Sequence, residues 1–247
     1  MASKLITIIA GVGPGTGAAV ARKFAKTYPV VLMARNPSNY DSLVEEINKS
    51  GGKAVGISAD ISDEASVKKA FGQIAEEFGG EVACAAAVFN ASGKFVRKPF
   101  LELSPSDFAT GYAVSGHGAF LFSQSTLPLL LRSVDQSPQY PPTLIFTGAT
   151  ASLKGGAQMS SFAAGKFALR ALAQSLGREF GPKGVHVAHA IIDGVIDIPR
   201  TKEWLQGAGP DAKISADAIA DAYWFLHTQH RSCFTNEIDI RPFVEKW

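Results

Sequence analysis

The feature that most constrains the fold is an alternation of short apolar runs with longer segments of helical pattern. Apolar runs this short, without regular polar alternation, are typical of strands buried on both faces of a parallel sheet. Right-handed crossovers through helices then cover both faces of that sheet. We therefore predict an α/β fold with a doubly wound parallel sheet of about seven strands and helices on both faces. The expected strands are residues 5–10, 30–34, 54–57, 82–89, 143–147, 185–192 and 237–240.

Helical segments are expected between these strands, and two of them have clear start signals. Ser62 can cap the third helix, and Ser104 followed by Pro105 is a strong start for the fourth. No repeat or interdomain linker interrupts the pattern, so residues 1–247 are expected to form one domain. The expected helices are residues 18–26, 41–49, 63–78, 106–131, 160–180 and 215–230.

Charge and cysteine content argue against several classes of protein. The 24 basic and 22 acidic residues give a formal net charge of +2, which points to neither nucleic acid nor an anionic membrane as a partner. Cys84 and Cys233 form no ligand pattern with histidines, so no metal site is predicted. No stretch approaches the roughly 18–20 apolar residues of a membrane span, and the first residues lack a secretory pattern. We expect a cytoplasmic protein.

A glycine-rich turn follows the first predicted strand and opens the first predicted helix. Gly11 permits a sharp exit from the strand, Gly15 lets backbone N–H groups approach a phosphate, and Gly17 allows close helix packing. A tight connection alone would also explain such a turn. Its place in the first strand–helix unit favours a Rossmann-type dinucleotide site. The turn reads Gly11-Val12-Gly13-Pro14-Gly15-Thr16-Gly17.

The residues after the second strand favour NADP(H) over NAD(H). An Asp or Glu there accepts a hydrogen bond from the adenosine ribose 2′-hydroxyl, whereas an arginine accommodates a 2′-phosphate. This chain has Arg35 between Ala34 and Asn36, with no carboxylate. The alternative is a solvated surface arginine, because Gly13-Pro14 adds no second cation.

Lys166 is a single cation on a mostly apolar helix face. Phe162 lies four residues earlier and shares that face. The lysine either lies along apolar surface with its ammonium in water, or points into a cleft toward a ligand. The other motifs favour the second interpretation, because they predict a cofactor site beside it.

Together these motifs resemble the short-chain dehydrogenase/reductase family over essentially the whole chain. The resemblance implies that Asp60 and Ile61 contact the adenine and that Asn90 lies beside the cofactor ribose. It also implies that Lys166 hydrogen-bonds the nicotinamide ribose. The motifs are Gly-x-x-x-Gly-x-Gly in the first turn, Ala59-Asp60-Ile61, Phe89-Asn90-Ala91-Ser92-Gly93 and Lys166.

Further contacts follow from the same resemblance. Gly194 and Ile196, after the sixth strand, are expected to touch the cofactor. A substrate lid is expected at residues 196–214. Helices 106–131 and 160–180 would pair with copies in another subunit, which implies a homodimer or homotetramer.

The family's catalytic residues are largely replaced in this chain. Its tyrosine, four before the lysine, is Phe162, its serine is Ala149 and its asparagine is Ser115. The proline of its Pro-Gly pair is Asp193. Because phenylalanine has no proton to give to a carbonyl oxygen, ordinary ketone reduction by the family's route is not expected.

Three functions are compatible with this pattern. The first is an NADP-dependent reductase with a non-standard active site, acting on an iminium ion, which needs only hydride, or on a conjugated carbonyl. The second is a protein that binds the cofactor without turnover, and the third is a lyase or cyclase that uses the pocket as a template. The candidate catalytic residues are Lys166, Thr150 and Ser161 as proton donors, Asp193 as a cation stabiliser, and Ser115 at the asparagine position.

Three peripheral features complete the prediction. Trp204 and Leu205 in the expected lid can form the floor of a site for an apolar ligand, although a tryptophan there can equally pack against the rest of the domain. His117, two residues past Ser115, should point off the cleft face. The tail, residues 240–247, is expected to make a subunit contact.

Overall fold

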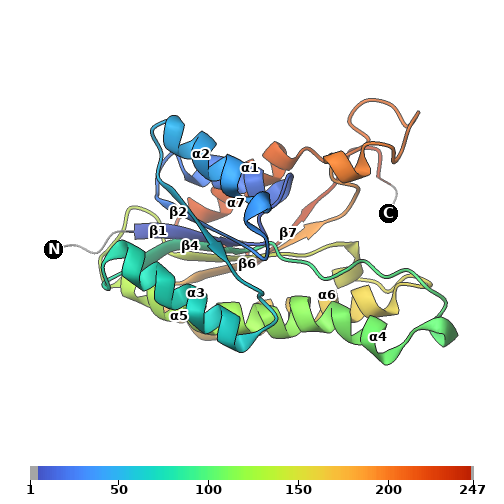
Figure 1. Cartoon of the computed structure of the whole chain (residues 1–247), viewed down its shortest axis with the longest axis horizontal. Coiled ribbons are helices and arrows are strands. Elements are labelled where there is room, and N and C mark those ends of the chain that lie inside the picture. Colours follow the sequence, from blue (N-terminus) through green and yellow to red (C-terminus); the bar gives the residue numbers. More distant parts are fainter. Residues whose placement is uncertain (1–4, 246–247) are drawn as a thin grey trace.

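The computed structural model describes residues 5–245, which form a seven-stranded parallel sheet between two layers of helices (Figure 1). The strand order is β3-β2-β1-β4-β5-β6-β7. This confirms the predicted doubly wound α/β fold, with the order reversing between β1 and β4. The strands are β1 Leu5–Ala10, β2 Val30–Ala34, β3 Ala54–Ser58, β4 Ala83–Phe89, β5 Thr143–Thr147, β6 His186–Ile192 and β7 Glu237–Ile240.

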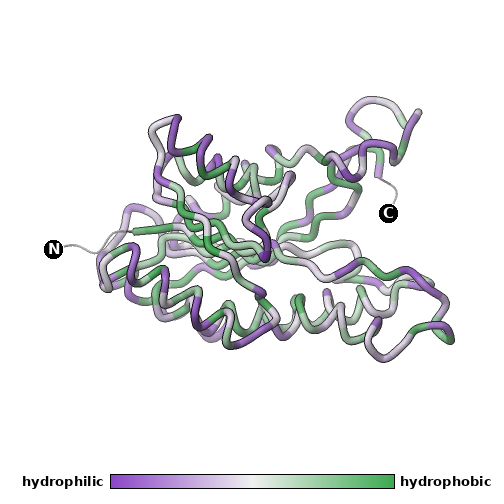
Figure 2. Tube along the Cα trace, viewed as in Figure 1, coloured by the Kyte–Doolittle hydropathy of each residue, from purple (hydrophilic) through white to green (hydrophobic). Residues whose placement is uncertain are grey.

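Helices cover both faces of this sheet. α1, α2 and α7 lie on one face, and α3, α5 and α6 lie on the other (Figure 1). Figure 2 shows the apolar strands at the centre and polar residues on the outer turns of the helices. None of the described helices has the length and apolar character needed to cross a membrane. The helices are α1 Thr16–Phe24, α2 Asp41–Lys49, α3 Glu64–Phe78, α4 Pro105–Tyr112, α5 Ala119–Val134, α6 Ser160–Phe180 and α7 Ala216–His227.

Several helix boundaries differ from the prediction. α1 begins at Thr16, within the glycine turn, and ends at Phe24. Asp63, not Ser62, caps α3, because its carboxylate accepts hydrogen bonds from the Ala65 and Ser66 N–H groups. Ser62 instead donates its hydroxyl to the Asp60 carboxylate. α7 ends at His227, three residues before the predicted end.

The predicted helix 106–131 is interrupted. A π-helical segment, Ala113–Gly118, separates α4 from α5. Such widened turns occur where an extra residue is accommodated within a helix, and they are frequent near functional sites. The predicted start is confirmed, since Ser104 and Asp107 form a reciprocal capping box at the beginning of α4.

α4 and α6 cross with their backbones almost in contact. A Cβ added to Gly111 would lie 2.1 Å from the Ser161 carbonyl oxygen, and one added to Gly165 would lie 2.3 Å from the Gly111 carbonyl oxygen. The Ser161 hydroxyl also donates to the Asp107 carbonyl, at 2.7 Å. This crossing fixes the first turns of α6, which carry Phe162 and Lys166.

Candidate active site

Two adjoining cavities lie over the carboxyl ends of the central strands. The first has a volume of about 770 Å³ and the second about 670 Å³. Gly11 follows β1 and Asn90 follows β4, so the cavities meet where the strand order reverses. In open α/β sheets this reversal is the usual place for a ligand. The residues that line both cavities are Gly11, Asn90, Ser92 and Arg200.

The glycine turn is built so that three of its glycines have separate functions. Gly11 has a φ of +91°, and a Cβ there would lie 2.4 Å from the Ala91 nitrogen. A Cβ on Gly17 would lie 2.7 Å from the Gly11 carbonyl oxygen, so this glycine lets α1 begin against the turn. Around Gly13, by contrast, no described atom lies within 4 Å of an added Cβ, so the turn stays open to the cavity. Asn90 fastens the turn to β4 by donating to the Gly11 carbonyl, at 2.9 Å.

The start of α1 fits a phosphate. No side chain caps this helix, whose first N–H groups lack partners within the helix. The Thr16 hydroxyl is buried and lines the first cavity, and among residues 5–245 it has no hydrogen-bond partner. Unpaired donors beside the positive end of a helix dipole suit a diphosphate. The residues present therefore fit a dinucleotide.

The second cavity joins Arg35 and Asp60, as expected for the adenosine end of a cofactor. Arg35, Asp60 and Ile61 all line it. The Ser62 hydroxyl and N–H donate to Asp60 Oδ1, at 2.6 and 2.9 Å. These hydrogen bonds, and secondarily the charge of Arg35, lower the pKa of Asp60. Its carboxylate is thus held ionised, with Oδ2 left to accept from a ligand.

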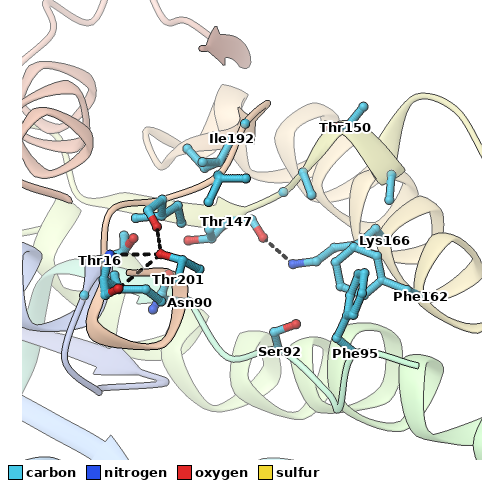
Figure 3. A pocket seen from close by; sticks show the side chains of 18 of the residues that line it. Thr16, Asn90, Ser92, Phe95, Thr147, Thr150, Phe162, Lys166, Ile192 and Thr201 are labelled. Atoms are coloured by element: carbon cyan, nitrogen blue, oxygen red, sulfur yellow. Dashed lines mark hydrogen bonds between the residues drawn. The ribbon is translucent and has the colours of Figure 1, made fainter. Parts of the chain in front are cut away.

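Lys166 is buried at the junction of β5 and α6. Its ammonium donates to the Thr147 carbonyl oxygen at 2.8 Å and lies 5.8 Å from the centre of the Phe162 ring (Figure 3). Only 4% of its surface is exposed, and this burial lowers its pKa to about 8. Lys166 and Phe162 both line the first cavity. Lys166 thus lies at the cleft and not along the outer surface, and its contact with a ligand stays a prediction.

Replacing Lys166 with methionine should remove a pH dependence of stability. In the unfolded chain the lysine pKa returns from about 8 to 10.5, so unfolding takes up a proton between those values and stability rises with pH. We expect the free energy of unfolding of the wild type to rise between pH of about 7.5 and pH of about 9.5. This rise should be about 2 kcal/mol larger in the wild type than in the variant. Urea denaturation at both pH values measures this difference. A Lys69→Met variant, altered on the exposed side of α3, should behave as the wild type.

Most of the other predicted catalytic residues do not face the cleft. Thr150 lines the first cavity, but its hydroxyl donates to the Asp193 carboxylate. Asp193 is itself paired with Arg241, at 3.2 Å, and is not among the residues that line the cavity. Its charge is therefore already compensated within the protein, and its role in stabilising a substrate cation stays a prediction.

The two predicted serines, Ser161 and Ser115, do not face the cleft either. The Ser161 hydroxyl donates to the carbonyls of Asp107 and Phe108 and not into the cleft, so its role as a proton donor stays a prediction. Ser115 is buried in the π-helical segment and lines neither cavity. Ser161 faces α4 because the α4–α6 crossing uses that side of α6.

The segment expected to be the substrate lid, residues 196–214, lines the first cavity in part. Ile196 and Trp204 line it, as does Gly194 just before the segment, whereas Leu205 does not. Ile198 lies over the glycine turn, with Cγ2 2.6 Å from a Cβ added to Gly15. Arg200, which lines both cavities, was not predicted, although it was a visible cation within the expected lid.

Three other residues that line the first cavity were not predicted, and His117 lies where it was expected. Phe95, Met159 and Lys154 line the first cavity and were missed, because they come from long loops without a local motif. His117 is exposed and stacks on Phe120, off the cleft as expected. A subunit contact was predicted for the tail, residues 240–247. Residues 246–247 of that tail lie outside the part of the chain that the structure describes.

Comparisons with known proteins agree with this architecture. A family model for short chain dehydrogenases matches residues 5–208. An uncharacterized oxidoreductase of Staphylococcus epidermidis is 26% identical over 238 residues, which is 96% of each chain. The short-chain dehydrogenase/reductase eriH of Hericium erinaceus is 31% identical over 81% of this chain and 78% of its own. A short-chain dehydrogenase structure from Rhodopseudomonas palustris is 32% identical, with a TM-score of 0.77 over 96% of this chain and 99% of that one.

The fold, the glycine turn and the buried lysine agree with these similarities to dehydrogenases and oxidoreductases. The family model covers well over half of the chain and ends within the lid. The chain therefore belongs to the short chain dehydrogenase family of oxidoreductases, which bind nicotinamide cofactors.

Proposed function

We propose that this protein is an NADPH-dependent reductase of conjugated carbonyl compounds, in which the Lys166 ammonium stabilises the negative charge that develops on the carbonyl oxygen. The observation that carries the proposal is the buried Lys166 ammonium beside Phe162 in the first cavity. With a pKa of about 8, its ammonium is a stronger hydrogen-bond donor than that of an ordinary lysine.

In this proposal, different residues of the cleft bind different parts of the cofactor. Thr16 and the N-terminus of α1 hold the diphosphate, while Arg35 and Asp60 face the adenosine end. When bound, NADPH supplies the hydride. Of the three N–H groups of Lys166, one is used by the Thr147 carbonyl, and two remain for the nicotinamide ribose and the substrate oxygen.

A conjugated carbonyl suits a site without tyrosine. Hydride adds to the β-carbon, the carbon–carbon π bond breaks, and its electron pair moves to the carbonyl oxygen as an enolate. Lys166 stabilises that oxygen by a charge-assisted hydrogen bond. The α-carbon then takes its proton from water. An ordinary ketone instead needs a proton at oxygen as the hydride arrives, which a tyrosine would give.

The cleft disfavours the other substrate that the sequence allowed, an iminium ion. The charged side chains that line the first cavity are Lys154, Lys166 and Arg200, all of them cations. Asp193 does not compensate them, because it is paired with Arg241. A cationic substrate would thus meet repulsion.

NADPH absorbance followed with enones, saturated ketones and cyclic imines tests the proposal. We expect enones to be reduced, with ketones and imines much slower. NADPH binding measured by calorimetry, without oxidation on any substrate, would instead identify a cofactor-binding protein without turnover. Consumption of a substrate at constant NADPH absorbance would identify a non-redox lyase or cyclase.

Replacing Arg35 with serine should weaken NADPH binding about tenfold or more, because a charge-assisted contact with the 2′-phosphate is lost. NADH affinity should stay nearly unchanged, since that cofactor has no 2′-phosphate. Calorimetric titration with both cofactors measures the ratio. Arg97→Ser is the matched control, because Arg97 is exposed and lines neither cavity. Equal losses for NADPH and NADH would contradict the assignment of Arg35.

Assembly into a homodimer or homotetramer is a further part of the proposal. Aromatic side chains stand exposed on α4, α5 and α6, the helices expected to pair. Tyr112 is 54% exposed, and Phe120 and Phe167 are each 43% exposed. Exposed aromatic groups gathered on neighbouring helices support a subunit contact on this face.

A further inference from the structure

Part of the lining of the first cavity is apolar and aromatic. Phe95, Met159, Phe162 and Trp204 line it. The rings of Phe95 and Phe162 pack edge to face, with their centres 5.2 Å apart (Figure 3). Phe95 and Trp204 nevertheless remain 47% and 49% exposed. Half-exposed aromatic rings around a cavity gain buried area when a flat apolar ligand enters.

Charge in the same cavity has one sign. Its lining contains Lys154, Lys166 and Arg200, and within the described part of the chain no carboxylate joins them. Asp193 lies between the lining residues Ile192 and Gly194, but its side chain turns to Thr150 and Arg241. The cavity therefore favours anions over cations.

Two of these three cations are already assigned to another contact or to the cofactor. Lys166 donates to the Thr147 carbonyl beside the reacting end. Arg200 lines both cavities, so it lies along the path of a cofactor that spans them and faces its anionic part.

Lys154 has no such assignment. It lies in the loop between β5 and α6 and lines the first cavity only. No ion pair within residues 5–245 occupies its ammonium. The loop is held near the cleft, because the Lys154 N–H donates to the Thr150 carbonyl at 3.2 Å.

We infer that the substrate is an aromatic or otherwise unsaturated carboxylic acid, whose carboxylate pairs with Lys154 while its apolar part lies among Phe95, Phe162 and Trp204. This inference rests on the proposed function, because it names the substrate of the same cleft. It concerns binding alone, so it can be tested without turnover. Because Lys154 is exposed, the preference for an anion should be modest and should weaken as salt is added.

Calorimetry on protein saturated with NADP⁺ gives the test. The probes are (E)-4-(3-oxobut-1-enyl)benzoic acid and its primary amide, which share the unsaturated ring system and differ in charge. We expect the wild type to bind the acid about fivefold to tenfold more tightly than the amide. Lys154→Met should remove that preference and Lys154→Glu should reverse it, with NADP⁺ affinity unchanged. Lys69→Met, which loses the same charge on α3, should keep the preference.

The outcomes separate the substrate inference from the proposed reaction. Equal affinity for the acid and the amide, a preference that survives Lys154→Glu, or no measurable binding of either probe would overturn the inference. Preferred binding of the acid without NADPH oxidation would support it and count against the reductase. Oxidation of NADPH with the amide as readily as with the acid would leave the reductase intact and refute the role of Lys154.

Discussion

Replacing Phe162 with tyrosine should raise the reduction of a saturated ketone by NADPH about a hundredfold or more. A positioned general acid contributes roughly 10²–10⁴-fold to proton transfer, and the phenylalanine ring lacks that acid. The Phe162 ring already lies in the first cavity, with its centre 5.8 Å from the Lys166 ammonium. That ammonium would lower the pKa of the new phenol. Initial rates at several pH values, under saturating NADPH, measure the gain.

The control for this variant is Phe167→Tyr. Phe167 lies on the same helix, is 43% exposed and does not line either cavity, so the same hydroxyl is added outside the cleft. Its ketone reduction should match the wild type. If Phe162→Tyr binds NADPH but gains nothing, then Ala149 and Ser115 limit the reaction as well, or the natural chemistry is not carbonyl reduction. Adding Ala149→Ser to the variant distinguishes these explanations.

Replacing Gly17 with alanine should lower the free energy of unfolding by about 1–3 kcal/mol and weaken NADPH binding at least about tenfold. The added Cβ would lie 2.7 Å from the Gly11 carbonyl oxygen and 2.9 Å from the Val12 Cα. These are backbone atoms, so relief requires α1 to move away from the turn. That movement displaces the N–H groups expected to hold the diphosphate. Urea denaturation and calorimetric titration measure the two effects.

Gly72→Ala provides the matched comparison. Gly72 also lies within a helix, α3, and no described atom lies within 4 Å of its added Cβ. Alanine is the better helix former by about 1 kcal/mol, so this variant should be more stable than the wild type. NADPH affinity should not change. If Gly17→Ala is stabilising as well, the close approach of α1 to the turn is not required.

The fold was predictable because its signals are local and repeated. Each buried strand is a short apolar run, and start signals such as Ser104-Pro105 appear within a few residues of a helix. The π-helical segment Ala113–Gly118 was not predictable, because its residues carry no local signal that distinguishes a widened turn from a regular one. Asp63, not Ser62, caps α3, because the Ser62 hydroxyl is used locally by the Asp60 carboxylate two residues earlier.

Site residues could be predicted where a strand end or the periodicity of a helix already determines the position of the side chain. The glycine turn, Asn90 and Lys166 follow directly from strand ends or helix periodicity, and they line the cavities. Asp193 and Ser161 lie beside the cleft in sequence, but their side chains are directed by distant partners, Arg241 and the backbone of α4. Such long-range pairing leaves no trace in local spacing.

The crossing of α4 and α6 fixes the position of α6 without using the side chains that α6 presents to the cleft. Gly111 and Gly165 set the distance between the helices by having no side chains, and Ser161 locks their rotation. Phe162 and Lys166 project from the other side of α6 into the cleft and take no part in that contact. We therefore expect that the side chains at these two positions can be exchanged without rebuilding the crossing. The chain should then tolerate redesign of its cleft, provided that the two glycines are kept.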